Sequence, residues 1–173
     1  CDAMGESIDE RRVILTCLFH DMGNIIKSDF SLLPNLVQEE GAAYWEGVKA
    51  EFIAKYGTSA HEANVAIARE LLLPEEVVAL IDGIGFGNMA DIAEQGSPEQ
   101  KVCEYADTRV GPYGILSQKE RLEEGHRRAE ASSREKNYYS EEGFLELVAA
   151  AAELERRVFE SLPLRPEDIT DAS

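Results

Sequence analysis

The sequence has no apolar run long enough to cross a bilayer, since no stretch approaches the roughly 18 consecutive apolar residues that a spanning helix needs. It also shows no basic and apolar leader of the kind that directs export. We therefore expect a protein that neither enters a membrane nor leaves the cell.

Basic residues are scarce: 17 Lys and Arg stand against 34 Asp and Glu, which gives a formal net charge of -17. A chain with this balance repels nucleic acids and anionic membrane surfaces at long range. We therefore expect no nucleic-acid and no membrane partner. A small phosphorylated substrate is still allowed, because a bound divalent ion can reverse the sign of the local potential.

Cysteine is also rare, and its number is odd, with Cys1, Cys17 and Cys103. Cys17 and Cys103 lie in apolar, helix-like segments without the spacing of a zinc finger, which favours reduced core thiols over a disulfide framework. The expected compartment is the cytoplasm.

No segment shows the sustained alternation of a half-buried strand, and there is no internal repeat. Helix signals recur instead. Two segments, Glu40–Lys55 and Ser140–Leu162, carry apolar residues at three- and four-residue spacing. Four others fit the capping box, which marks a helix start: Ser7–Glu10, Ser59–Glu62, Ser97–Gln100 and Ser117–Glu120. We predict an all-α fold.

With 173 residues, the chain suits one globular domain, which we place at residues 1–163, followed by an acidic tail at 164–173 that is expected to fray. The opening letters CDAM resemble the end of a helix closed by Gly5, so we expect that further residues precede them. Loops are predicted at residues 27–38, 83–88, 111–114 and 132–139.

The stretch LTCLFHDMGNIIKSDF, residues 15–30, sets His20 and Asp21 side by side in an apolar segment. If one helix runs from Ile8 to about Ile26, Asp21 shares its inward face with Ile14 and Ile25. A buried carboxylate must be neutralised, paired with a cation or bound to a metal. The alternative is that Asp21 caps or bridges locally and that His20 is a satisfied core histidine.

Two further polar residues are expected on inner faces. His61 begins a row with Val65, Ala68 and Leu72, and the positive end of its helix favours a neutral imidazole that can bind a metal. Asp107 shares a face with Cys103 in the run VCEYADTRV. The alternatives are a plain first-turn residue for His61 and a salt bridge for Asp107.

Imidazole and carboxylate donors from separate helices form a coherent nitrogen and oxygen site. Such donors suit Mn, Fe, Zn, Co or Mg ions rather than copper or a thiolate-bound metal. We therefore expect a divalent cofactor, with His20, Asp21, Asp107 and His61 as candidate ligands.

In this order, the segments LFHDMGN, SAHEANVAIARELLLPEEVVALI and YADTRVGPYGILSQKERLEEG resemble the HD-domain superfamily of metal-dependent phosphohydrolases. The resemblance implies an HD-domain-like helical bundle whose metal is held by an upstream histidine, the His-Asp doublet and a later aspartate. His20, Asp21 and Asp107 match the last three. The first helix is incomplete here, and no histidine precedes the doublet.

The chain departs from the family pattern at two other places. Many members have a lysine soon after the doublet, whereas this sequence has Asn24, with Lys27 as a substitute one turn later. Members with two metals have more histidines after the helix that His61 opens, whereas this sequence reads IDGIGFGN there, which argues against a two-metal centre. His61 is then a further ligand, a neighbour of the ligands or a phosphate contact.

The expected activity is hydrolysis of a small phosphorylated compound, such as a nucleotide, by metal-activated water. Asp21 would accept a proton from the water, and His61 would bind the metal or protonate the leaving group. Lys27 and Arg109 would hold phosphate oxygens, unless they are simply solvated surface cations.

Two other functions fit the sequence. One is a non-catalytic helical module that uses the same residues to bind a metal or a nucleotide. The other is a helical partner-binding module without metal, which needs a cationic partner for each aspartate. A homodimer through the last long helix is a further expectation.

Overall fold

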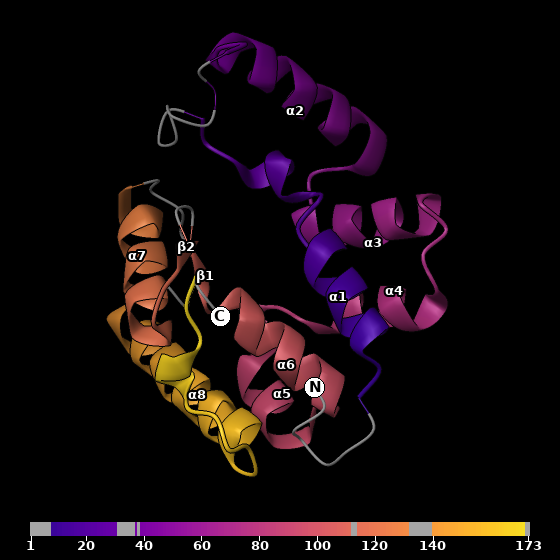
Figure 1. The fold of residues 1–173 in the computed structure, drawn as a ribbon. Coiled ribbons are helices and arrows are strands. Elements are labelled where there is room, and N and C mark those ends of the chain that lie inside the picture. The colour runs from indigo at the N-terminus through magenta and orange to yellow at the C-terminus, as the bar shows by residue number, and fades with distance from the viewer. Residues whose placement is uncertain (1–7, 31–36, 38, 112–113, 132–139, 172–173) are drawn as a thin grey trace. The chain divides into compact units, whose positions relative to one another are not determined.

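The computed structural model describes residues 8–30, 37, 39–111, 114–131 and 140–171, which are mostly helical (Figure 1). The predicted all-α class is confirmed. Within these residues, no helix combines the length and the apolar character that crossing a membrane requires. The contacts of the chain group it into two compact units: unit 1 contains Cys1–Cys17 and Gly83–Ser173, and unit 2 contains Leu18–Asp82. The expected domain boundaries, 1–163 and 164–173, stay a prediction.

Unit 2 consists of short helices around the segment that follows the His-Asp doublet. Its elements are the 3-10 helix η2 (Asn24–Lys27) and the α-helices α2 (Ala42–Tyr56), α3 (Ala60–Glu70) and α4 (Glu75–Gly83), of which only Gly83 falls outside the unit. Helix η2 packs against both α2 and α3. The ammonium group of Lys49 on α2 donates to the carbonyl of Ser28 at 2.8 Å, which fixes the end of η2.

Unit 1 is built around the long helix α8. It contains most of α1 (Glu10–Phe19), then η4 (Phe86–Asn88), α5 (Met89–Gln95), α6 (Pro98–Asp107), β1 (Val110–Gly111), β2 (Gly114–Ile115), α7 (Gln118–Ala131), α8 (Glu141–Phe159) and η6 (Pro166–Asp168). Helices α5, α6 and α7 each pack against α8. Strands β1 and β2 pair antiparallel, with Val110 opposite Ile115. These strands are too short to show the alternation that would have predicted them.

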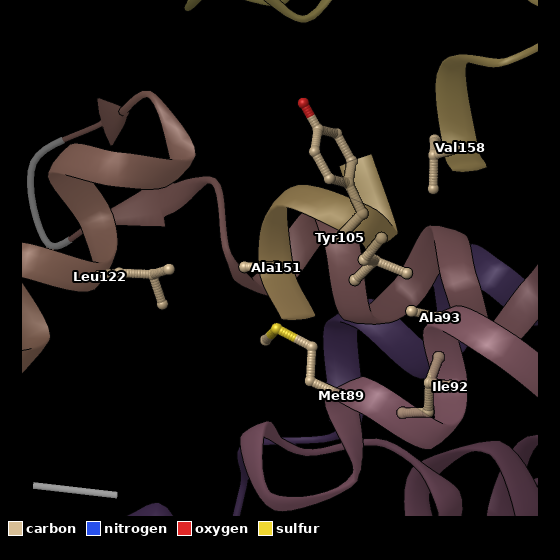
Figure 2. Close-up of a cluster of buried hydrophobic side chains, with 8 residues drawn as sticks. Met89, Ile92, Ala93, Tyr105, Leu122, Ala151 and Val158 are labelled. Carbon is tan, nitrogen blue, oxygen red and sulfur yellow. The ribbon is translucent and has the colours of Figure 1, made fainter. Parts of the chain in front are cut away.

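The core of unit 1 is an apolar cluster between α5, α6, α7 and α8. Figure 2 shows its members, which include Met89, Ile92, Leu122, Ala151 and Val158. The ring of Tyr105 packs in this cluster while its hydroxyl group points out of it and donates to Glu155 at 3.2 Å (Figure 2). Burial raises the pKa of Tyr105 to about 12. Tyr105 therefore stays neutral and keeps its hydroxyl proton for hydrogen bonding.

Three of the four predicted helix starts are confirmed. The Ser59 hydroxyl accepts from the amide of Glu62 at the start of α3. Ser97 and Gln100 form the reciprocal capping box of α6, and Ser117 and Glu120 form the same pair of bonds before α7. The fourth start, at Ser7, lies outside the described residues, as does the predicted loop at 132–139. The periodic segment Ser140–Leu162 appears as α8, capped by Ser140.

The prediction of one helix from Ile8 to about Ile26 is wrong, because α1 ends at Phe19. In a continued helix, the amide of Gly23 would donate to the carbonyl of Phe19. It donates instead to Oδ1 of Asn64 on α3, at 2.5 Å. A tertiary hydrogen bond has thus replaced a helical one, and the chain turns after Phe19.

The prediction of which side chains of this segment face inward is also wrong. Val13 and Thr16 are buried, whereas Ile14 and Leu18 are exposed. Because α1 ends before Asp21, helical spacing no longer aligns that carboxylate with the apolar face. Asp21 is exposed instead of inward-facing. The desolvation argument for a metal at Asp21 therefore fails, and any case for a metal must rest on how the donors are arranged.

The C-terminal tail has more contacts than a fraying segment would have. The Arg109 guanidinium donates to the carbonyls of Pro166 at 3.1 Å and Ile169 at 3.0 Å. The amide of Ile115 in β2 donates to the Asp171 carboxylate at 2.9 Å. One buried arginine and one strand amide thus attach residues 166–171 to the body of unit 1.

Candidate functional site

The His-Asp doublet lies in the turn that follows α1. Nε2 of His20 is 3.6 Å from Oδ1 of Asp21, and the two side chains are 17% and 54% exposed. The imidazole is thus mostly enclosed while the carboxylate reaches solvent. This arrangement offers one nitrogen and one oxygen donor to a single ion at the surface.

The turn that carries the doublet is held by close packing on α3. Besides accepting the Gly23 amide, Asn64 is itself buried. A Cβ atom at Gly23 would lie 2.7 Å from the Ala60 carbonyl oxygen and 2.8 Å from the Ala63 Cβ, which is closer than real contacts allow. Only glycine therefore fits here, and this close approach fixes the backbone two residues after Asp21.

Within unit 1, two contacts set the register of α1 on α6. The amide of Asp9 donates to the Glu99 carboxylate at 3.4 Å, and one turn further the Cys103 sulfur lies 3.9 Å from the Val13 carbonyl oxygen. From the first contact to the second, each segment advances by four residues, from Asp9 to Val13 and from Glu99 to Cys103. The two helices therefore run in the same direction where they touch.

Asp107 is the last residue of α6 and is half-buried. The buried residue after it, Thr108, ends the helix by donating its hydroxyl to the Tyr105 carbonyl at 2.7 Å. Gln118 on α7 donates to the same hydroxyl at 3.2 Å. The position of Asp107 on unit 1 is thus fixed by its neighbours. His20 and Asp21 belong to unit 2, so the convergence of the three residues on one ion stays a prediction.

His61 lies in the first turn of α3, and its side chain is exposed rather than on the apolar side. Its Nε2 atom lies 3.0 Å from Oδ1 of Asp82 on α4, and the two side chains are 50% and 61% exposed. In the row predicted to be apolar-facing, Val65 and Ala68 are buried, but His61 and Leu72 are not. The prediction of an apolar-facing row is therefore wrong at its two ends. His61 lies in the first turn of α3, and Leu72 lies beyond the last residue of the helix. The predicted metal or catalytic role of His61 stays a prediction.

The two predicted phosphate-binding cations differ in their surroundings. Lys27 is exposed at the end of η2. Arg109 is buried, and its guanidinium donates to the Leu116 carbonyl at 2.5 Å and to the Tyr105 hydroxyl, besides the two tail carbonyls. Arg109 therefore has a structural role in unit 1. A phosphate contact for either residue stays a prediction.

Three supporting residues were not expected from the sequence. Gly23 and Asn64 hold the doublet turn, and the buried Glu104 accepts the Gly85 amide at 2.6 Å in the loop after α4. A signal for Asn64 was present, because it lies on the same helical face as the apolar residues Ile67 and Ala68. An amide side chain on a buried face requires a hydrogen-bond partner.

A comparison of the chain with protein-family models, curated proteins and solved structures finds no match. The resemblance to the HD-domain superfamily therefore stays a prediction from the three quoted segments.

Proposed function

We propose that the protein is a metal-dependent phosphohydrolase of small phosphorylated compounds, such as nucleotides, with His20, Asp21 and Asp107 as ligands of a divalent ion. The donor set fits such an ion, because one imidazole nitrogen and two carboxylate oxygens suit Mn, Fe, Zn, Co or Mg. A divalent ion bound there would lower the pKa of its bound water toward about 7 and would withdraw charge from a phosphoryl oxygen.

The observation that carries the proposal is the register of α1 on α6 in unit 1. Asp9 meets Glu99 and Val13 meets Cys103, so the same register continued by one turn brings Cys17 to the level of Asp107. The doublet follows Cys17 by three and four residues, in the turn after α1. The short stretch of chain between Cys17 and the doublet supports the proposal of a common ion for the doublet and Asp107.

The protein residues would have separate tasks. His20 is mostly enclosed and would hold the ion through a fixed ring. Asp21 is partly exposed and would both bind the ion and accept a proton from the attacking water. His61, the alternative proton donor for the leaving group, would first have to exchange its bond with Asp82.

The non-catalytic alternative has an observation in its favour. Arg109 already donates to backbone carbonyls, and His61 is bonded to Asp82, so two of the residues expected to handle phosphate have other partners. Under this alternative, the chain binds a metal or a nucleotide without turnover.

The test compares aspartates that differ in their proposed role. The full chain is treated with chelator, reconstituted with Mn²⁺ and assayed for bound metal and for hydrolysis of nucleoside monophosphates, triphosphates and cyclic nucleotides. Asp21→Asn and Asp107→Asn should each reduce bound metal to background and turnover by about 100-fold or more. The matched control is Asp82→Asn, which removes a carboxylate that also faces a histidine and should leave metal binding intact.

The two functions give different outcomes. Metal binding that depends on Asp21 and Asp107, without turnover on any substrate, would support the binding module. Equal metal content in Asp21→Asn and Asp82→Asn would contradict both, because the doublet would then have no special role.

A further inference from the structure

Two cysteine side chains from different helices meet in unit 1. Cys17 on α1 packs against a buried apolar cluster that contains Val13, Ile84 and Cys103. The Cys103 thiol is buried, lies 3.9 Å from the Val13 carbonyl oxygen and is also hydrogen-bonded to the Cys17 thiol. Neither of the two is in a disulfide. The parallel register of α1 and α6 thus brings together two thiols that are 86 residues apart in the sequence (103 − 17).

We propose that Cys17 and Cys103 form a modification site at which a hydroperoxide converts the two thiols into an intramolecular disulfide. The geometry favours this pair because both thiols are held in one cluster, so the second thiol is present at high effective concentration. A disulfide needs the two Cβ atoms at about 3.5 to 4.5 Å, and adjacent helices in side-chain contact can provide such a separation.

The two cysteines have different roles in the reaction. The Cys17 thiolate attacks the peroxide, whose O–O bond breaks, leaving a sulfenic acid on Cys17 and releasing one water molecule. The Cys103 sulfur then attacks the Cys17 sulfur, the S–O bond breaks, and a second water molecule leaves. In total the two thiols give two electrons and two protons to hydrogen peroxide, and two water molecules form.

The environment of each thiol supports this order. The hydrogen bond with Cys17, together with burial, raises the pKa of the Cys103 thiol well above its usual value. Cys17 is half-buried rather than buried, so an oxidant reaches it more readily. Because the thiolate is the nucleophile, Cys17 is the first to react and Cys103 resolves the sulfenic acid.

The position of the pair gives the modification a consequence for the proposed ion site, and this part rests on the proposed function. Cys17 precedes His20 by three residues, and Cys103 precedes Asp107 by four, so each thiol is close along the chain to a proposed ligand. Forming a bond of about 2.05 Å between the sulfurs draws α1 and α6 together. We therefore expect the oxidised chain to bind Mn²⁺ about 10-fold more weakly, the effect typical of a displaced residue beside metal ligands.

The first experiment detects the bond itself, without metal. The full chain, stripped with chelator, is treated with hydrogen peroxide, its remaining thiols are alkylated, and its peptides are analysed by mass spectrometry. Wild type and Cys1→Ser should both yield a Cys17–Cys103 linked peptide, whereas Cys17→Ser and Cys103→Ala should not. A stable sulfinic acid on Cys17 without the link, or a link through Cys1, would overturn the proposal.

The second experiment measures Mn²⁺ affinity by calorimetry before oxidation, after oxidation and after reduction with dithiothreitol, in wild type and Cys1→Ser. A fall in Mn²⁺ affinity on oxidation that dithiothreitol reverses supports control of the ion site by the disulfide. Unchanged affinity in a chain shown to contain the disulfide overturns that control. If the reduced chain binds no Mn²⁺, the proposed function fails, while the linked peptide still decides the modification site.

Discussion

The two histidine–aspartate pairs of unit 2 are held in different ways. His61 and Asp82 are the closer pair, at 3.0 Å, but both side chains are largely exposed. His20 and Asp21 are 3.6 Å apart, yet the His20 ring is mostly enclosed and its turn is packed on α3. A short distance between exposed groups contributes little, because solvent screens it and both side chains keep other conformations. Enclosure of the ring and a fixed backbone are better signs of a functional site than the shorter distance.

The local backbone explains why the pairs differ. His61 lies in the first turn of α3 and Asp82 in the last turn of α4, so each faces the helix end that disfavours its charge. The contact between the two side chains offsets the unfavourable interaction of each with its helix end. The doublet, in contrast, lies in a turn whose position depends on one glycine and one buried asparagine. Changes at those two residues should therefore affect the doublet and not the His61–Asp82 pair.

The largest expected effect comes from Gly23→Ala. The added methyl group would meet the Ala60 carbonyl oxygen at 2.7 Å, and a helix backbone cannot move aside as a flexible side chain can. We expect unit 2 to lose about 3 kcal/mol of stability, the upper end for overpacking. Fluorescence of Trp45, the one tryptophan of the sequence, reports on unit 2 during unfolding in urea.

Gly47→Ala on α2 is the matched control. A Cβ at Gly47 meets nothing within 4 Å, and alanine favours a helix over glycine by about 0.5–1 kcal/mol, so this variant should be as stable as wild type or more stable. Equal stability of Gly23→Ala and wild type would show that the turn is not held by packing.

A smaller effect is expected from Asn64→Ala. It leaves the buried Gly23 amide without its acceptor, which should cost about 1 to 2 kcal/mol. Because the sequence has three histidines, their ring resonances can be resolved by proton NMR, and those of His20 should change more than those of His61. Asn88→Ala, at an exposed asparagine, should change neither. Larger changes at His61 than at His20 would contradict the proposed support of the doublet.

Several helix starts of this chain follow from local signals, and three predicted starts are confirmed. Ser59, Ser97 and Ser117 cap their helices with side chains a few residues away, so the necessary partners are visible in the sequence. The spacing of apolar residues alone predicted a helix over Ser140–Leu162, which appears as α8 with its buried residues Ala151 and Val158. Local interactions of this kind do not depend on the rest of the fold.

The doublet turn could not be predicted in this way. Its cause is a hydrogen bond between residues 41 positions apart, from Gly23 to Asn64, and no local pattern shows which helix supplies the acceptor. The same limit applies to the Arg109 side chain, which resembles a surface cation in the sequence but holds tail residues nearly 60 positions away. Residue type and spacing therefore indicate the site residues, whereas the residues that support them become visible only in the tertiary contacts.

The smallest expected effect concerns the His61–Asp82 pair. In a double-mutant cycle with His61→Ala and Asp82→Ala, the coupling energy should be about 0.2–1 kcal/mol, as for other exposed pairs, and should fall in 1 M salt. Both single variants should bind Mn²⁺ like wild type if His61 is not a ligand, whereas His20→Ala should not. A loss of Mn²⁺ binding in His61→Ala but not in Asp82→Ala would show that His61 is a ligand. The two histidine–aspartate pairs would then not differ in function, because His61 would be part of the same ion site as the doublet.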